Sequence, residues 1–114
     1  MSVVLITGAA HRIGAFLSME MAKSGWEIAL HYHGSRKDAQ KVQTCIQEKG
    51  GRCELFSADF LNEDEVTGLI GCVVDKMGRI DCLINNASTF EQDSALTVSR
   101  ESWDLHMEVN LRAP

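Results

Sequence analysis

The sequence lacks any apolar run that approaches the roughly 18 residues needed for a membrane-spanning helix, and it has no excess of positive charge. Its formal net charge of −5 argues against nucleic acid or an anionic membrane as the main partner. No basic stretch precedes the short apolar run at the start, so no signal peptide is expected. Repeats, low-complexity tracts and linkers are also absent. These absences predict a single domain over residues 1–114 with a cytoplasmic location.

Cysteine is present without the spacing of a metal or redox site. No C-x-x-C pair is formed by the four cysteines, Cys45, Cys53, Cys72 and Cys82. We therefore expect reduced, mostly buried thiols in a cytosolic protein, and no bound metal. An apolar content of 45% is enough for one core, and a charged content of 24% is ordinary for a globular domain.

Short apolar segments alternate with helical patterns along the whole chain. Strands are expected at residues 3–7, 26–32, 52–58 and 81–85, with helices at 12–24, after Ser35, after Asn62 and after Ser99. The alternation predicts an α/β fold, half of a three-layer Rossmann type: a parallel sheet in the order 3-2-1-4 with helices on both faces, interrupted before a fifth strand. Topology then places five residues at the crevice between the first and fourth strands: Gly8, Arg12, Asn86, Ala87 and Ser88.

Apolar spacing predicts which helix faces are buried. The expected inward faces are Ile13, Phe16, Leu17 and Met21 in the first helix, Ala39, Val42, Cys45 and Ile46 in the second, and Val66, Leu69, Ile70, Val73, Val74 and Met77 in the third. Ser35 is expected to cap the second helix, and Asn62 with Glu65 resembles a capping box at the start of the third.

Two glycines organise the first strand, turn and helix. The segment 3–6 predicts a buried strand that breaks at Gly8, after which the first helix begins. The unpaired N–H groups and the positive dipole end of that helix form an anion site. Gly8 permits a tight turn, and Gly14 removes a Cβ where helix and strand approach closely. The alternative is a turn that needs small residues and binds nothing.

No acidic residue directly follows the second strand, where an NAD-binding unit uses one to hold the ribose 2′-hydroxyl. Ser35, Arg36 and Lys37 supply instead a hydroxyl, a guanidinium and an ammonium group, which favour the extra phosphate of NADP. The alternative is a solvated basic start of a helix. His31 and His33 are equally compatible with hydrogen-bonded strand histidines.

Residues after the third and fourth strands complete the candidate site. Asp59 is placed to accept a hydrogen bond from an adenine amine, or it is a loop acid or helix cap. Asn85 and Asn86 can fix both backbone and cofactor, although asparagine is also a common strand-ending residue. Phe90 lies among polar neighbours and can stack on a flat substrate or tuck into a local core.

Four segments in this order resemble the short-chain dehydrogenase/reductase superfamily over the whole chain: Thr7–Gly14, Asp59, Asn85–Ala87 and Val109–Leu111. Arg12 stands where most members have their middle glycine. The segments His31 to Ser35 and Asn85 to Phe90 look most like those of pteridine reductases.

The resemblance implies NADP as cofactor and a role for each matching position. Thr7, Gly8 and Gly14 would shape the pyrophosphate turn, with Arg12 reaching the pyrophosphate and the substrate. His11, Ser35 and Arg36 would meet the 2′-phosphate, and Asp59 would hold adenine. Asn86, Ala87 and Ser88 would line the nicotinamide, with Ser88 also touching substrate and Phe90 stacking on a pterin ring. Ile13, His33 and Phe60 are further cofactor-binding positions, and Asn110 matches the catalytic asparagine that orders a water relay.

One departure from the family is decisive for activity. The family's proton donor is a Tyr four residues before a Lys, whose charge helps to lower the tyrosine pKa. The single tyrosine, Tyr32, ends the second strand and is followed four residues later by Arg36, so it is not that donor. We therefore expect the cofactor-binding part of an NADPH-dependent reductase for a carbonyl or pterin substrate, a fragment inactive by itself.

Two alternatives remain at this stage. The chain is a nucleotide-binding or interaction module without catalysis, or its parent reduces another carbonyl such as a 3-oxoacyl thioester, a sugar or a steroid. The unpaired edge of the fourth strand predicts a homo-oligomer, or else a last helix that is displaced or poorly ordered.

Overall fold

The computed structural model describes residues 1–114 and contains a four-stranded parallel sheet in the order β3-β2-β1-β4. Along the chain the elements are β1 (Val3–Ile6), α1 (Arg12–Lys23), β2 (Glu27–Tyr32), α2 (Arg36–Glu48), β3 (Cys53–Ser57), α3 (Glu63–Met77), β4 (Cys82–Ile84), α4 (Arg100–Met107) and a π-helical turn, Glu108–Arg112. The predicted strand order and fold class are confirmed, and each strand is one to two residues shorter than predicted.

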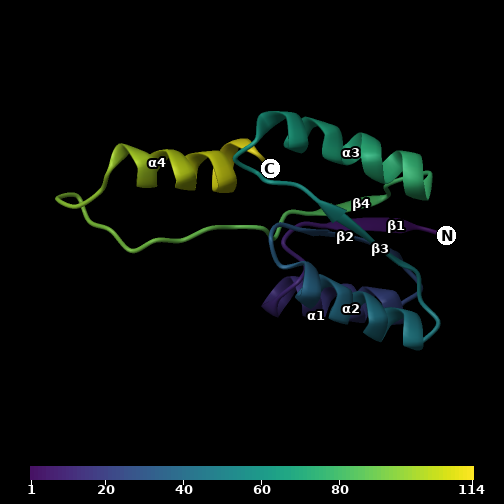
Figure 1. The fold of residues 1–114 in the computed structure, drawn as a ribbon. Coiled ribbons are helices and arrows are strands. Elements are labelled where there is room, and N and C mark those ends of the chain that lie inside the picture. The colour runs from purple at the N-terminus through teal and green to yellow at the C-terminus, as the bar shows by residue number, and fades with distance from the viewer.

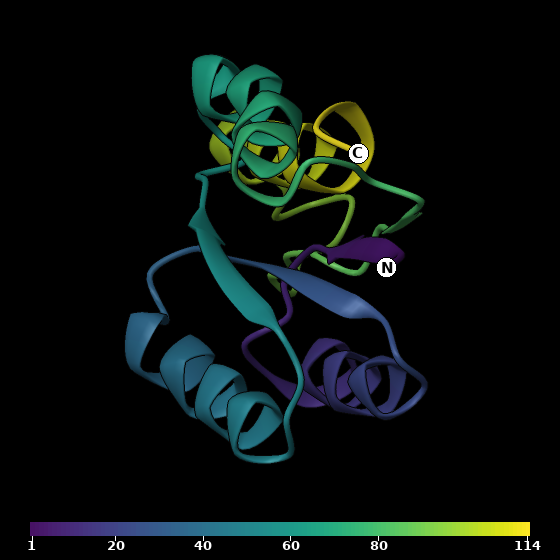
Figure 2. The ribbon, with the colours of Figure 1, turned by 90° about the vertical axis from the view of Figure 1, so that its right-hand side faces the viewer.

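Helices cover both faces of the sheet, with α1 and α2 on one face and α3 on the other (Figure 1). Figure 2 shows the same layers from the side. The β1 side chains alternate between the two cores: Val4 and Ile6 belong to the α1/α2 core, whereas Val3 and Leu5 belong to the α3 core. All four are fully buried, as expected for a central parallel strand.

Helix α1 faces the sheet with small residues, which corrects the predicted apolar face. Ile13 and Phe16 are 67% and 58% exposed, whereas Gly14 and Ser18 are buried. The Ser18 hydroxyl donates to the Gly14 carbonyl at 2.8 Å, so this buried polar group keeps a partner. Because α1 approaches the sheet through small side chains, its large apolar residues at 13 and 16 rotate outward. Leu17 packs partly against the core, as predicted.

Helix α3 buries a narrower row than its apolar spacing predicts. Leu69, Val73 and Met77 are buried, whereas Ile70 and Val74 are 46% and 40% exposed. The buried residues are spaced four apart and face the sheet. Ile70 and Val74 lie on the adjacent side of the helix and point away from the sheet.

The start of α3 carries half of the predicted capping box. The Asn62 side chain accepts N–H groups of Asp64 and Glu65, as an N-cap should. The Glu65 carboxylate, however, accepts from the Asp59 N–H at 3.2 Å, because the Asn62 N–H already donates to the Asp59 carbonyl.

Asp81 fastens the beginning of β4 to the beginning of β1. Its carboxylate accepts the Val3 N–H at 2.8 Å, and its own N–H donates to the Val3 carbonyl. The Arg79 guanidinium donates to the same carboxylate at 2.8 Å. The Arg79 contact, followed by the Val3 N–H, holds the pKa of Asp81 below its ordinary value. Strand β4 pairs with β1 alone, so its other edge is open.

The four cysteines are all free, but the expectation that most are buried is wrong. Only Cys53 is buried, and burial raises its pKa to about 12. Cys82 is half-buried, whereas Cys45 and Cys72 are exposed on the outer faces of α2 and α3. Cys45 lies one residue off the buried row of α2, formed by Ala39, Val42 and Ile46.

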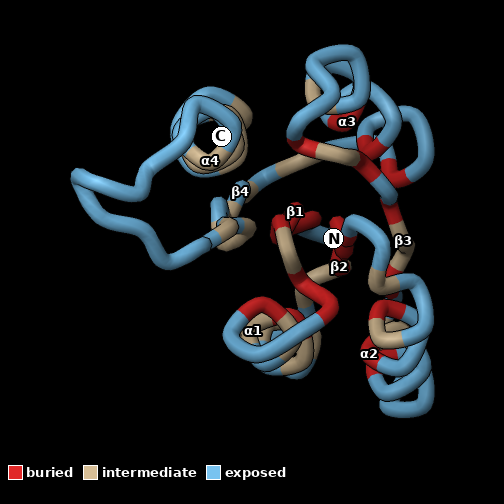
Figure 3. The backbone as a smooth tube through the Cα atoms, turned by 60° about the vertical axis from the view of Figure 1, so that its left-hand side comes forward, coloured by how far each residue is buried: buried red, intermediate tan, exposed pale blue.

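Helix α4 lies beyond the end of the sheet, on the α3 side, after an extended loop whose residues are largely exposed (Figure 3). The Ser99 hydroxyl caps it by accepting the Ser102 N–H at 3.0 Å. The helix lies where the sequence predicts it, but residues Glu108–Arg112 form a π-helical turn instead of continuing the α-helix. Trp103, Met107 and Leu111 are exposed along one side. None of the helices combines the length and the apolar character required to cross a bilayer.

Candidate functional site

A cleft of about 940 Å³ opens at the carboxyl ends of the strands, where the order 3-2-1-4 places the switch point. The sequence-predicted site residues that line it are Gly8, His11, Arg12, Ile13, His33, Ser35, Asp59, Phe60, Asn86, Ala87 and Ser88. Thr7 and Gly14 lie behind this lining, and Arg36, Phe90 and Asn110 lie outside it.

The two glycines of the turn lie against the segment after β4. Gly8 has a φ of +62°, and a Cβ there would come within 2.8 Å of the Ala87 Cα. A Cβ on Gly14 would lie 2.6 Å from both the Asn86 Nδ2 and the Gly8 carbonyl oxygen. The close approach predicted at Gly14 is therefore to the turn and the β4 segment, rather than to the strand itself.

Thr7 joins the ends of β1 and β4 from behind the cleft. Its buried Oγ1 accepts the N–H groups of Asn86 and Ala87, each at 3.0 Å. The Asn86 Nδ2 donates in return to the Thr7 and Gly8 carbonyls, each at 3.1 Å. These contacts fix the turn before any ligand is bound.

Arg12 begins α1 with a φ of 48°, the left-handed region that favours glycine. Holding a non-glycine residue there costs about 1–2 kcal/mol. The exposed Arg12 side chain lines the cleft, beside the first N–H groups of α1, which have no partner within the helix.

His11 precedes α1 and reaches across the cleft rim to α2. Its Nε2 lies 2.6 Å from the Asp38 carboxylate, and this hydrogen bond lowers the pKa of Asp38. Ser35 occupies the N-cap position of α2, but its side chain makes no capping hydrogen bond, so that part of the prediction is wrong. Ser35 lines the cleft. The Arg36 guanidinium donates to the Tyr32 hydroxyl at 3.3 Å.

His31 is the hydrogen-bonded strand histidine that the sequence left as one alternative. Its Nδ1 accepts the Gly8 N–H at 3.0 Å, and its Nε2 donates to the Ala58 carbonyl at 2.9 Å. The ring stacks on Phe60, with centroids 4.4 Å apart. Burial lowers the pKa of His31, which favours the neutral ring. His33, by contrast, is exposed at the rim, 3.8 Å from the Asp59 carboxylate.

The segment after β3 forms one wall of the cleft. Asp59 Oδ1 accepts the Leu61 N–H at 2.9 Å, so Asp59 orders this turn as a loop acid. Its Oδ2 faces His33. Phe60, the next residue of this wall, is buried, and its ring stacks on His31. The wall thus places a carboxylate beside a largely buried aromatic ring at the edge of the cleft.

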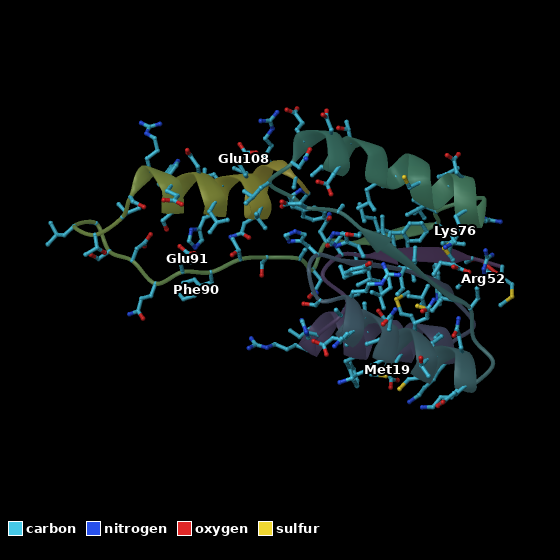
Figure 4. All side chains as sticks on the ribbon, in the orientation of Figure 1. Met19, Arg52, Lys76, Phe90, Glu91 and Glu108 are labelled. Atoms are coloured by element: carbon cyan, nitrogen blue, oxygen red, sulfur yellow. The ribbon has the colours of Figure 1, made fainter.

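Phe90 and Asn110 both belong to the α4 side of the molecule. Phe90 is 82% exposed and meets His106 edge-on, so it does not tuck into a local core. It lies with Glu91 on the extended loop beside α4 (Figure 4). The Asn110 side chain accepts the Thr89 N–H at 2.8 Å and donates to the Thr89 carbonyl at 2.9 Å. Asn110 therefore fastens this loop to the π-turn.

Several residues that line the cleft were not predicted as site residues: Ala10, His31, Tyr32, Ala58, Leu61, Thr89, Leu105 and Val109. Leu105 and Val109 are four residues apart on the last helical segment, a spacing that marks a shared face. The family-like segments His31 to Ser35 and Val109 to Leu111 were a second signal, for His31, Tyr32 and Val109. Ala10, Ala58 and Leu61 are apolar residues that resemble ordinary core positions, and Thr89 lies in a loop without a distinguishing pattern.

The sheet order, the glycine turn and a helix N-terminus facing the cleft define a dinucleotide-binding protein of the Rossmann type. The family model described as short chain dehydrogenase matches residues 2–114, and the chain belongs to this family of oxidoreductases.

Relatives and solved structures agree with this assignment. The chain is 32% identical over 108 residues, 95% of its length, to a 3-oxoacyl-(acyl-carrier-protein) reductase of Staphylococcus aureus. A solved structure of FolM alternative dihydrofolate reductase 1 from Brucella suis in complex with NADP is 33% identical, with a TM-score of 0.92 over 99% of this chain. A short chain dehydrogenase from Burkholderia cenocepacia with NADP is 30% identical, with a TM-score of 0.94 over 98%.

The chain covers only part of these proteins. It spans 44% of the Staphylococcus aureus reductase, 47% of the Brucella suis chain and 46% of the Burkholderia cenocepacia chain.

Proposed function

We propose that the chain is the cofactor-holding part of an NADPH-dependent reductase that reduces a carbonyl or pterin substrate. The observation that carries this proposal is the rim after β2, where Ser35, whose side chain makes no capping hydrogen bond, lines the cleft beside His11 and His33. No carboxylate directly follows the strand in sequence, and the first one after it, Asp38, is engaged by His11 at 2.6 Å. Two similar structures, from Brucella suis and Burkholderia cenocepacia, are complexes with NADP, which supports the same cofactor here.

The lining residues fit a dinucleotide, and each has a proposed task. Unpaired N–H groups at the start of α1 bind the pyrophosphate, with Arg12 beside them. Asp59 and Phe60 hold the adenine, whereas Asn86, Ala87 and Ser88 border the nicotinamide. Bound NADPH supplies the hydride. Asn110, through the π-turn, positions the segment behind the reacting groups.

The 2′-phosphate is expected to be read by Ser35 and its neighbours. In a fluorescence titration, the wild-type chain should bind NADPH at least about tenfold more tightly than NADH, because charge-assisted hydrogen bonds hold the phosphate. Ser35→Asp should abolish this preference by weakening NADPH alone, since the new carboxylate repels the phosphate. Aspartate is as favourable as serine at an N-cap, so α2 should remain intact by circular dichroism.

Equal affinities for NADPH and NADH in the wild-type chain would contradict the proposed phosphate site. So would a Ser35→Asp variant that loses both cofactors equally, because that pattern reports damage to the fold rather than repulsion of one phosphate.

The substrate class has two candidates. The 33% identity to an alternative dihydrofolate reductase favours a pterin, with Arg12 and Phe90 as contacts. The 32% identity to a 3-oxoacyl-(acyl-carrier-protein) reductase favours a 3-oxoacyl thioester. The chain contains no Tyr-x-x-x-Lys, so we propose that it turns over neither substrate alone. A non-catalytic nucleotide-binding role for the isolated chain is consistent with this. Turnover of NADPH with dihydrobiopterin or acetoacetyl thioester by these residues alone would contradict it.

Association between copies is expected because apolar side chains remain uncovered. Trp103 on α4 is 57% exposed, Leu111 on the π-helical turn is 67% exposed, and β4 has an open edge. Light scattering of the chain at micromolar concentration should give a mass of at least twice the monomer. Trp103→Glu should shift the population toward monomer, whereas Arg100→Glu, on the same helix, should not.

The four free thiols support the proposed cytoplasmic location.

A further inference from the structure

We propose that neutral His31 is a positioning residue that sets the geometry of the glycine turn and the adenine wall together. The inference rests on the proposed function, because it concerns the same cofactor cleft. His31 touches neither end of the ligand directly in this proposal. It acts through the two protein segments that do.

One side of His31 holds the glycine turn. The imidazole Nδ1 accepts the Gly8 N–H at 3.0 Å, and the His31 carbonyl accepts the Ala9 N–H at 2.9 Å. The first two N–H groups of the turn are therefore consumed by one residue. The donors left for an anion are the later ones, at the start of α1, so His31 determines which part of the turn faces the pyrophosphate.

The other side of His31 holds the wall after β3. Its Nε2 donates to the Ala58 carbonyl at 2.9 Å, and its ring stacks on Phe60 with an interplanar angle of 13°. Ala58 and Phe60 both line the cleft. A movement of the ring would consequently displace the wall and the turn at once.

These partners require one tautomer. The Gly8 N–H can only donate, so Nδ1 must carry a lone pair, and the proton must lie on Nε2. Protonation of Nδ1 would place two N–H groups against each other and release the turn. The charged and titratable groups around the ring act on this step: His33 disfavours a second charge, Asp59 faces His33, and Glu65 on α3 binds the Asp59 N–H. Across the rim, His11 is paired with Asp38.

The test compares NADPH affinity from pH 8 to pH 5 in the wild-type chain, His31→Asn and His31→Phe. The asparagine Oδ1 replaces the Nδ1 acceptor without titrating, whereas phenylalanine keeps the stacking and removes both hydrogen bonds. The ratio of wild-type to His31→Asn affinity cancels the pH dependence that the cofactor phosphate and the rest of the protein contribute to both variants. We expect this ratio to fall about tenfold as His31 is protonated, and His31→Phe to bind about tenfold more weakly at every pH.

A second readout does not depend on the cofactor. In the ¹⁵N NMR spectrum of the wild-type chain, the Gly8 amide should shift with the same midpoint as the His31 ring nitrogens, and it should stay unchanged in His31→Asn. A Gly8 amide that does not respond to protonation of His31 would overturn the proposal, and so would an affinity ratio that stays constant across the His31 midpoint measured by NMR. A wild-type chain that binds no NADPH at any pH would refute the proposed function, and the Gly8 amide would then decide the role of His31 alone.

Discussion

Replacement of Gly14 by alanine is expected to lower the free energy of unfolding by about 2–3 kcal/mol and to weaken NADPH binding. The added Cβ would lie 2.6 Å from the Asn86 Nδ2 and from the Gly8 carbonyl oxygen. The second neighbour is backbone, so the turn itself must move. Because this turn forms one side of the proposed cofactor cleft, stability and affinity should fall together. Urea unfolding and an NADPH titration measure the two effects.

The matched control is Gly68→Ala in α3. Gly68 also lies within a helix, but a Cβ there meets no atom within 4 Å. Alanine should therefore stabilise α3 by about 0.5–1 kcal/mol through its better helix propensity. If both variants shifted the unfolding midpoint in the same direction by the same amount, the crowding at Gly14 would not be the cause.

Thr7→Val is expected to cost about 2–4 kcal/mol of unfolding free energy, because it removes the acceptor of two partly buried N–H groups at once. Those groups belong to Asn86 and Ala87, and each lies 3.0 Å from the Thr7 oxygen. Valine has nearly the shape of threonine, so packing should change little. The loss should loosen the segment after β4 and expose its amides, which hydrogen exchange at Asn86 and Ala87 would detect.

Thr7→Ser separates the hydroxyl from the methyl group. Serine keeps the acceptor and loses one methyl, so its cost should be about 1 kcal/mol. A serine variant as unstable as the valine variant would show that methyl packing, rather than the two hydrogen bonds, joins β1 to β4.

Much of the fold could be predicted because strong local patterns agree with one another. The continuous apolar run at 3–6 corresponds to a central strand buried on both faces, and β1 is that strand. Alternating strands and helices left one common topology, which the sheet adopts. The turn at Gly8 was predictable because a tight turn needs a residue that tolerates positive φ.

Helix faces were harder to predict, because apolar spacing does not record how closely a helix approaches its sheet. Gly14 and Ser18 bring α1 near, so Ile13 and Phe16 turn outward. Cys45 was assigned inward because it neighbours a buried row, yet a single helical step moves a side chain by about 100°.

The sequence allowed us to predict which chain segments form the site, but not which side chains contact one another within it. Strand ends must meet at the switch point, which located Asn86 and Ser88 correctly at the cleft. The contact of His11 with Asp38 joins residues 27 positions apart, and no local pattern encodes it. The position of Phe90 depends on a long loop, for which periodicity gives no rule.

The hydrogen bonds between Asp81 and Val3 should make the β4 edge of the sheet more sensitive to acid than the other strands. The lowered pKa of Asp81 means that its carboxylate favours the folded sheet above the ordinary aspartate pKa of about 3.9, and that this contribution disappears as the pH falls through the lowered value. Strand β4 has three residues and one partner, whereas β2 is paired on both sides. Acidification should thus detach β4 from β1 first, so that β1, β2 and β3 remain paired until global unfolding begins.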